Sequence, residues 1–188
     1  MYNHIAMAKA CDRDLVLQAR RGATQAYGEL VQRYQASVFG VCLRMMDERQ
    51  EAEDMTQDAF LRAYQHLDTY DTERPFGPWI RRVAANLCLN RLARSRRAVM
   101  PLEDELDQPS ESADPGPEAL TEIKEQQEIV RAAVLSLPPH YRAVIELRHF
   151  QGLRYAEISE ALGIPLSDVK SHLYRARQRL ARRLLQDA

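Results

Sequence analysis

Residues 155–177, YAEISEALGIPLSDVKSHLYRAR, contain two amphipathic segments separated by a glycine turn. The first segment, 155–162, is short, and Gly163 can adopt the positive φ that a tight turn between helices needs. We expect Ser167 to cap a second, long and basic helix that continues to about Leu185. A short helix, a glycine turn and a longer helix together predict a helix-turn-helix.

The last helix has two distinct faces at 100° per residue. Val169, Leu173, Ala176 and Leu180 form an apolar strip that we expect to face inward. The opposite face suits the major groove of DNA, where Arg and Lys read guanine and Gln reads adenine. The alternative is a basic, solvated helix at the end of an ordinary bundle. The polar residues on or beside the outward face are Ser167, Lys170, Ser171, Tyr174, Arg175, Gln178 and Arg182.

The net charge of −1 is an average over unlike segments. Residues 1–98 carry 15 basic and 12 acidic side chains, and residues 128–188 carry ten basic and six acidic. Residues 99–127, between them, carry nine acidic and one basic side chain together with four prolines, a composition typical of an extended linker. We therefore predict a first domain at 1–98, a flexible linker at 99–118 and a second domain at 119–188.

The apolar spacing predicts helices throughout both domains and gives no strand signal. Only seven glycines and 7% aromatic residues also argue against a Gly-rich sandwich or barrel. In the first domain we expect four helices, with Thr24 capping the second and Asp47 the third. The fourth should begin at Pro75 or Pro78. The apolar residues that we expect to face inward on this fourth helix are Trp79, Val83 and Leu87.

The predicted third helix carries a mixed polar and apolar patch of Asp54, Gln57, Asp58 and Leu61. Such a patch suits an arginine-bearing helix of a partner protein. The alternative is an ordinary solvated face, because most acidic helix faces bind nothing.

The segment 74–97 interleaves basic residues with aromatics and asparagines. This composition suits single-stranded or opening DNA, because cations hold phosphates, aromatic rings stack on bases and asparagines bond to base edges. The spacing of Trp79 favours a core position, so Tyr70, in the polar loop 68–75, is the better stacking candidate. The basic residues of the segment's helical part are Arg81, Arg82, Arg91, Arg94, Arg96 and Arg97.

Signatures of catalysis are missing from the sequence. It has no Gly-rich phosphate loop, no H-E-x-x-H and no nucleophile elbow, and its five histidines lack ligand spacing, so we expect no enzyme activity, metal or other cofactor. Cys11, Cys42 and Cys88 show no C-x-x-C and are interpreted as reduced thiols. With no signal peptide or apolar run that could span a bilayer, we expect a cytoplasmic protein without membrane insertion.

Three motifs now reveal a resemblance that extends from Asp12 to Leu185. They are EAEDMTQDAF at 51–60, FGPWIRRVAAN at 76–86, and the run LRH…GLRYAEISEALGIP…VKSHLYRAR within 147–177. In this order, and separated by an unrelated linker, they resemble bacterial RNA polymerase sigma factors of the extracytoplasmic-function group, in the sigma-70 family.

The resemblance implies an all-α protein, with sigma region 2 in the first domain and region 4 with its helix-turn-helix in the second. It implies an alternative sigma factor that binds core RNA polymerase and promoter DNA. The polymerase contacts would be the β′ coiled coil and the β flap, an anti-sigma factor would be a further partner, and the active protein would associate with the nucleoid. The negatively charged linker would occupy the RNA path in the polymerase cleft.

The resemblance also implies roles for individual residues. Phe60 joins the polymerase-binding patch of Asp54, Gln57, Asp58 and Leu61. Tyr70 and Asn86 match positions that capture a flipped base of the −10 element. Asn90 stands where relatives often have Asp. The residues assigned to the −10 element are Tyr70, Arg81, Arg82, Asn86 and Asn90, and those assigned to the −35 element are Arg148, Ser167, Lys170, Ser171, Tyr174, Arg175 and Gln178.

Other classes of function fit the sequence less well. A free-standing helix-turn-helix regulator should carry a receiver domain or ligand pocket before its DNA-binding part, and the helical, Gly-poor first half offers neither. An adaptor that binds only protein would not need the outward cations Lys170, Arg175 and Arg182. A nucleic-acid-processing enzyme would need a metal or acid–base cluster.

Overall fold

The computed structural model describes residues 10–99 and 121–186, and every regular element among these residues is helical. The all-helical prediction is therefore confirmed. The expected linker lies outside the described residues except for Val99, which ends α4. The elements are α1 (Asp12–Arg20), α2 (Thr24–Met45), α3 (Arg49–Gln65), the 3-10 turn η1 (Leu67–Thr69), α4 (Phe76–Val99), α5 (Thr121–Leu135), α6 (Pro139–Ile145), the π-helical turn η2 (Glu146–Phe150), α7 (Tyr155–Leu162) and α8 (Leu166–Gln186).

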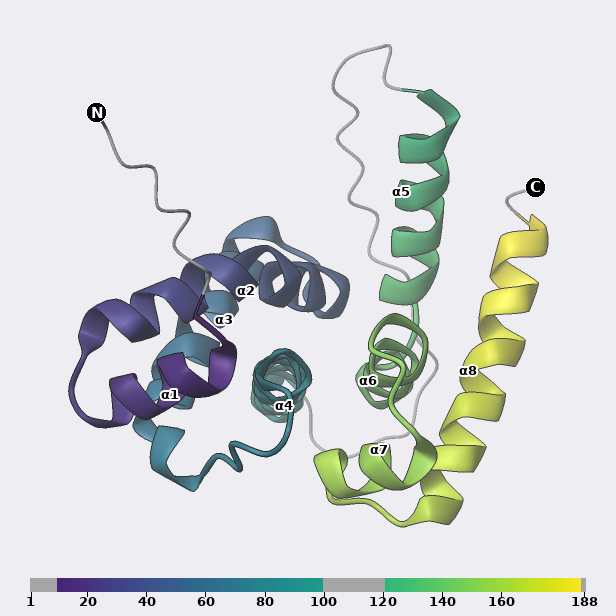
Figure 1. Ribbon diagram of the computed structural model, residues 1–188. Coiled ribbons are helices and arrows are strands. Elements are labelled where there is room, and N and C mark those ends of the chain that lie inside the picture. Colours follow the sequence, from purple (N-terminus) through teal and green to yellow (C-terminus); the bar gives the residue numbers. More distant parts are fainter. Residues whose placement is uncertain (1–9, 100–120, 187–188) are drawn as a thin grey trace.

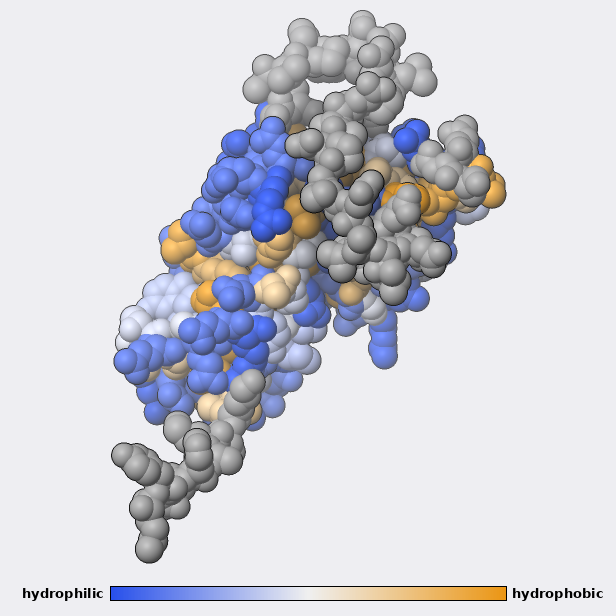
Figure 2. Space-filling model, turned by 90° about the horizontal axis from the view of Figure 1, so that it is seen from above, coloured by the Kyte–Doolittle hydropathy of each residue, from blue (hydrophilic) through white to orange (hydrophobic). Residues whose placement is uncertain are grey.

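The helices form two groups, α1–α4 and α5–α8, which meet where α4 lies beside α6 (Figure 1). The sequence predicted two domains joined by a flexible linker. In the structure the two groups pack together, and one continuous cluster of buried apolar residues extends from Leu15 to Ala176. The face seen from above is largely hydrophilic, with separate apolar patches between the polar residues (Figure 2).

Helix α4 is central to this packing, since it contacts α2 and α3 on one side and α6 on the other. Its predicted inward strip is displaced, because Trp79 is only half-buried and the fully buried positions include Phe76, Ile80 and Ala84. An α-helix covered on two sides buries a wide arc. The prediction assumed that α4 buries a single face, and the residues it chose lie at the edge of the wider arc that is buried.

None of the three predicted helix caps, Thr24, Asp47 and Ser167, is confirmed by the structure. Helices α2 and α3 are preceded by Ala23 and Glu48, and neither side chain makes a capping hydrogen bond. Ser167 lies inside α8, with its Oγ 3.2 Å from Asp168 Oδ1. The turn residue is correctly predicted, because Gly163 ends α7 with φ of 65° and leads into α8.

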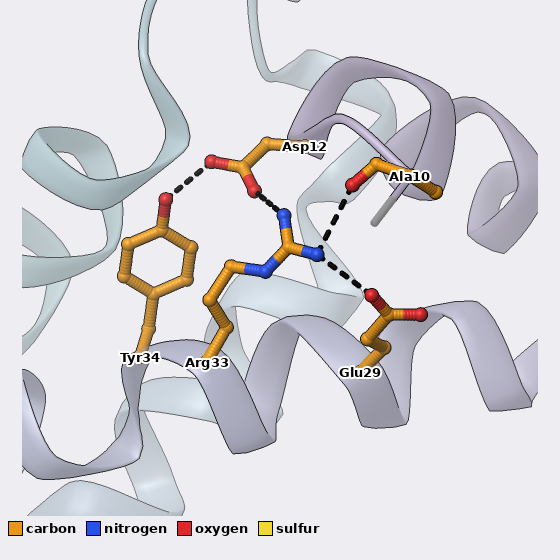
Figure 3. Close-up of polar contacts among 5 residues, drawn as sticks. All are labelled: Ala10, Asp12, Glu29, Arg33 and Tyr34. Carbon is orange, nitrogen blue, oxygen red and sulfur yellow. Dashed lines mark hydrogen bonds and ion pairs between the residues drawn. The ribbon is translucent and has the colours of Figure 1, made fainter. Parts of the chain in front are cut away.

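A polar cluster ties α1 to α2 (Figure 3). The Arg33 guanidinium donates to Asp12 Oδ1 at 2.5 Å, to Glu29 Oε1 at 2.6 Å and to the Ala10 carbonyl oxygen at 3.0 Å. The Tyr34 hydroxyl donates to the other Asp12 oxygen. Burial, together with this hydrogen bond, raises the pKa of Tyr34 to about 12. The cluster thus fixes the start of α1 on α2.

Among the described helices, none combines the length and the apolar character that crossing a lipid bilayer requires.

Candidate nucleic-acid and protein interfaces

The outward face of α8 is open to solvent. Val169, Leu173 and Ala176 are buried as predicted, and this anchors the helix against α6 and α7. On the other face Tyr174 is 64% exposed, and its hydroxyl accepts a 2.8 Å hydrogen bond from Gln178 Nε2. Of the remaining predicted −35 residues of α8, Ser167, Lys170 and Arg175 are exposed and Ser171 is half-buried.

Arg148 is used within its own half of the protein. Its guanidinium donates to the Leu153 carbonyl oxygen at 2.9 Å and lies 5.3 Å from the centre of the Tyr155 ring. The side chain thereby holds η2 against the start of α7. Its predicted contact with the −35 element would come in addition to this structural role.

Two histidines at the contacts of α8, His149 of η2 and His172 of α8 itself, are hard to protonate. His149 Nε2 is 3.3 Å from the Arg177 guanidinium, and burial followed by the charges of Arg177 and Arg148 lowers its pKa. Burial also lowers the pKa of His172, whose ring packs against His140 and Tyr141. Both rings therefore favour the neutral form.

The predicted −10 residues of α4 differ in accessibility. Asn90 is exposed, whereas Arg81, Arg82 and Asn86 are half-buried. The amide Nδ2 of Asn86 donates to the carbonyl oxygen of Ala161 in α7 at 2.7 Å. This prospective base-binding group is therefore already engaged by the second half of the chain.

Tyr70 does not occupy the exposed position that its polar loop suggested. It is only 5% exposed, because η1 turns it inward against Trp79 and Phe76, with ring-centre distances of 4.7 and 5.6 Å. Its hydroxyl donates to the Arg74 carbonyl oxygen, and burial raises its pKa to about 12. Trp79, which we expected in the core, is the more accessible of these rings. The expected ranking of the two aromatics is thus reversed in this conformation.

The predicted protein-binding patch on α3 is largely accessible. Asp54, Gln57 and Asp58 are exposed, and Leu61 is 62% exposed. Phe60 is instead buried, and its carbonyl oxygen accepts a 2.6 Å hydrogen bond from the Tyr27 hydroxyl.

An apolar groove of about 520 Å³ lies between α2 and α3 beside this patch. The sequence analysis did not identify this groove. The available signal was the pair of large side chains, Leu61 and Tyr64, on an otherwise polar helix face. The groove is lined by Thr24, Tyr27, Val31, Gln35, Thr56, Gln57, Phe60, Leu61 and Tyr64.

All three cysteines carry free thiols. Cys11 is exposed, whereas Cys42 and Cys88 are fully buried in the core between α2 and α4. Their mutual hydrogen bond lowers the pKa of Cys42 and raises that of Cys88. Nor do the described residues bring together a cluster of side chains able to hold a metal ion.

Comparison with known proteins places both halves of the chain. Residues 30–98 match the family model for sigma-70 region 2, and residues 127–180 match that for sigma-70, region 4. The chain is 32% identical to the ECF RNA polymerase sigma factor SigW of Bacillus subtilis, over 90% of this chain and 94% of the relative. It is also 32% identical to the ECF RNA polymerase sigma-E factor of Escherichia coli, over 89% and 91% of the two chains.

Solved structures share the fold. The structure of CnrH in complex with the cytosolic domain of CnrY superimposes with a TM-score of 0.65 at 26% identity, and covers 94% of this chain and 99% of that one. The sigma factor RpoE of Bartonella quintana, solved with the anti-sigma factor NepR, gives a TM-score of 0.64 at 18% identity, covers 86% of this chain and 98% of that one, and shows the fold alone.

An all-helical chain with a region 2 half and a region 4 helix-turn-helix half is a transcription initiation factor, a non-catalytic subunit of RNA polymerase. Within that class, this chain belongs to the extracytoplasmic-function sigma factors of the sigma-70 family. It directs promoter-specific transcription initiation with RNA polymerase. This assignment takes the place of the free-standing regulator considered above.

Proposed function

We propose that α8 reads the −35 element, α4 and the preceding loop read the −10 element, and the α2–α3 groove binds core polymerase. The observation that carries this proposal is the exposed polar and basic face of α8, which is held by a buried apolar strip on its other side. A rigid helix with accessible Lys, Arg, Tyr and Gln side chains can enter a major groove without unfolding any other part of the domain.

The groove supports a polymerase contact of the helix-in-groove kind. An amphipathic helix binds an apolar groove through large side chains, and charged residues at the rim fix its orientation. Leu61 and Tyr64 supply the exposed apolar surface, and Asp54 and Asp58 lie exposed on the same helix. The partner that we propose, from the family resemblance, is the β′ coiled coil, with region 4 on the β flap.

The −10 contact requires a base to leave the stack and enter a pocket. Asn86, Arg81 and Arg82 lie along α4, and the first turn of that helix carries Phe76 and Trp79, which pack with Tyr70. Cations that hold the backbone and an amide that bonds to a base edge suit an opened strand. The half-buried Trp79 adds an accessible ring that sequence analysis left out of this site.

We further propose an anti-sigma factor as the regulator of this chain and the cytoplasm as its location, with nucleoid association once it joins polymerase. The domain boundaries at 98 and 118 remain part of the same proposal. Support for the regulator comes from the family resemblance and from CnrH, which was solved in complex with the cytosolic domain of CnrY.

The polymerase contact is tested by titrating the labelled chain with core RNA polymerase and recording fluorescence anisotropy. We expect one-to-one binding that Leu61→Asp weakens by at least about tenfold, since a charge would enter an apolar contact. The matched control is Arg62→Asp, which introduces the same residue on the same helix at an exposed position outside the groove.

The outcomes separate the groove from other surfaces. Loss of binding in Leu61→Asp alone supports the groove, provided that the far-UV circular dichroism is unchanged. Equal affinity of the wild type and Leu61→Asp would remove the groove as the docking site.

A further inference from the structure

The loop that precedes α4 is held by the last residue of α1. The guanidinium of Arg20 donates from Nε and from a terminal nitrogen to the Leu67 carbonyl oxygen, at 3.0 and 2.8 Å. The same terminal nitrogen donates to the Tyr70 carbonyl oxygen. Leu67 begins the turn η1, and Tyr70 directly follows it. A single side chain therefore fixes both ends of η1, at the point where the chain enters the loop 71–75.

These hydrogen bonds are stronger than ordinary contacts within a turn. The donor is charged, and charge-assisted hydrogen bonds are about twice as strong as those between neutral groups. Arg20 is half-buried, and Leu67 and Tyr70 are buried, so water competes poorly for the two carbonyl groups. The guanidinium also belongs to the last turn of α1, where the helix dipole favours a cation.

Helix α1 is itself a rigid support for this contact. Its residues Leu15, Val16 and Ala19 are buried in the core. At its other end, Arg33 of α2 donates to Asp12, the first residue of the helix (Figure 3). A functional site is held more precisely when its supporting groups belong to helices whose own positions are fixed. Helix α1 can therefore act as the fixed base from which the loop is placed.

The loop beyond η1 has its own internal hydrogen bonds, so its placement depends on where it is attached. Asp71 Oδ1 accepts from the Glu73 backbone nitrogen at 3.0 Å, and the Asp71 carbonyl oxygen accepts from the Arg74 backbone nitrogen at 3.1 Å. A second contact with α1 joins Arg13 to Glu73 at 2.9 Å, but both side chains are more than half exposed, and such ion pairs contribute little. Arg20 is thus the stronger of these two contacts between α1 and the segment before α4.

We propose that Arg20 is a positioning residue for promoter recognition, which holds η1 and the loop 71–75 in the arrangement that receives a base of the −10 element. This inference rests on the proposed role of the loop and α4 in reading that element. Arg20 precedes residues 30–98, the part of the chain that matches the region 2 model, and it acts without touching the base. By ordering the loop beforehand, it lowers the entropy that the loop would lose when DNA binds.

The test measures whether Arg20 and one base of the −10 element act together. The full chain, assembled with core RNA polymerase, is titrated with a labelled single-stranded oligonucleotide that carries the non-template −10 sequence of a promoter that this polymerase transcribes. In a parallel set of oligonucleotides, each base in turn is replaced by an abasic residue. For the wild type we expect one position at which loss of the base costs the most affinity, because a pocket receives that base.

Arg20→Ala should weaken binding of the intact oligonucleotide by about 5- to 30-fold, as expected when a few side chains must be ordered on binding. An abasic residue at the most sensitive position should then cost little more, because a displaced loop no longer holds that base. Abasic residues elsewhere should cost the same in the variant as in the wild type. The matched control is Arg21→Ala, which removes the same charge from an exposed neighbour and should bind every oligonucleotide like the wild type.

The conservative variant Arg20→Lys keeps the charge but replaces the planar fork by a single ammonium group, so we expect it to recover part of the affinity. If circular dichroism shows that Arg20→Ala does not fold, the same comparison is made with Arg20→Lys.

The outcomes separate this inference from the proposed function. Unchanged affinity in Arg20→Ala, or an equal further loss at every abasic position, would overturn the positioning role, while the reading of the −10 element would stand. A wild-type complex that binds all the abasic oligonucleotides as tightly as the intact one would instead overturn the reading of the −10 element by the loop and α4, and the inference with it.

Discussion

Single residues show most clearly where physical reasoning from the sequence succeeds. Gly163 was predicted because few residues other than glycine adopt its positive φ, and Val169 and Leu173 because a regular helix repeats its buried face. The burial of Tyr70 was not predicted, because a loop of polar residues gives no sign that one of its side chains packs against Phe76 and Trp79. The exposure of a loop residue depends on contacts made elsewhere in the molecule.

Tyr70→Ala should therefore destabilise the first half by about 3–5 kcal/mol, as expected when a large buried ring is removed. Tyr70→Phe keeps the packing and loses only the hydrogen bond to Arg74, so we expect a cost near 1 kcal/mol. Urea unfolding followed by circular dichroism measures both values. Equal stability of Tyr70→Ala and the wild type would show that the ring is not packed in solution.

Arg175→Ala should weaken binding of the polymerase complex to a promoter with its −35 element by about 5- to 150-fold, as for loss of a base contact in the major groove. Core polymerase binding should be unchanged, because Arg175 lies on the exposed face of α8. The measurement is anisotropy with matched and scrambled −35 sequences. Equal losses on both sequences would assign Arg175 to the phosphate backbone instead of the bases.

At the scale of elements, the sequence located nearly every helix but not how it begins or which arc it buries. Amphipathic spacing predicts that a helix exists. The predicted caps are wrong although each helix begins within a few residues of its expected cap. The exact first residue of a helix depends on tertiary packing, which the amphipathic spacing does not show. Helix α4 was assigned one buried face, and its buried arc became apparent only from its contacts with α6.

The packing of α8 on α6 and η2 makes stability depend on pH. His149 and His172 have lowered pKa values in the folded protein, whereas their unfolded value is 6.5, so the unfolded chain binds more protons as the pH falls. The free energy of unfolding should therefore decrease from about pH 7 to about pH 5 through these residues. Arg148, Arg175 and Arg177 add to the effect, and Asp168 opposes it for His172.

Urea midpoints at pH 7.5 and 5.5 test this dependence, and the double variant His149→Gln/His172→Gln should show a smaller difference between the two midpoints. An unchanged difference in the double variant would assign the pH dependence to other groups.

At the scale of the whole molecule, the contact between the halves lay beyond the reach of sequence reasoning. Arg44 and Glu146 are 102 residues apart, and neither belongs to a motif. Proline and charge composition identified a break in the chain, and composition says nothing about whether the two sides of such a break touch. The family could be predicted because its motifs are local, and the docked arrangement could not because it depends on pairs of distant residues.

Thiol reactivity reports on this arrangement as a whole. In the native protein, Ellman's reagent should modify Cys11 at once, while Cys42 and Cys88 should react only as fast as the core opens. Three equivalents should react promptly in denaturant, as the control. Prompt reaction of all three thiols in the native protein would contradict the continuous core.

Two arginines of the second half, which donate hydrogen bonds to carbonyl groups at the end of α2, determine whether the two halves of the chain can be exchanged independently. Two separate family models match the chain, one for region 2 and one for region 4. Here Arg131 and Arg142 of one part satisfy carbonyl groups of the other, so the first part alone would leave the Met45 and Asp47 carbonyls to water. A chimera that joins residues 1–98 to region 4 of another sigma factor would contain the same end of α2. Its two halves would pack together in this way only if the other region 4 places arginines at the positions of Arg131 and Arg142.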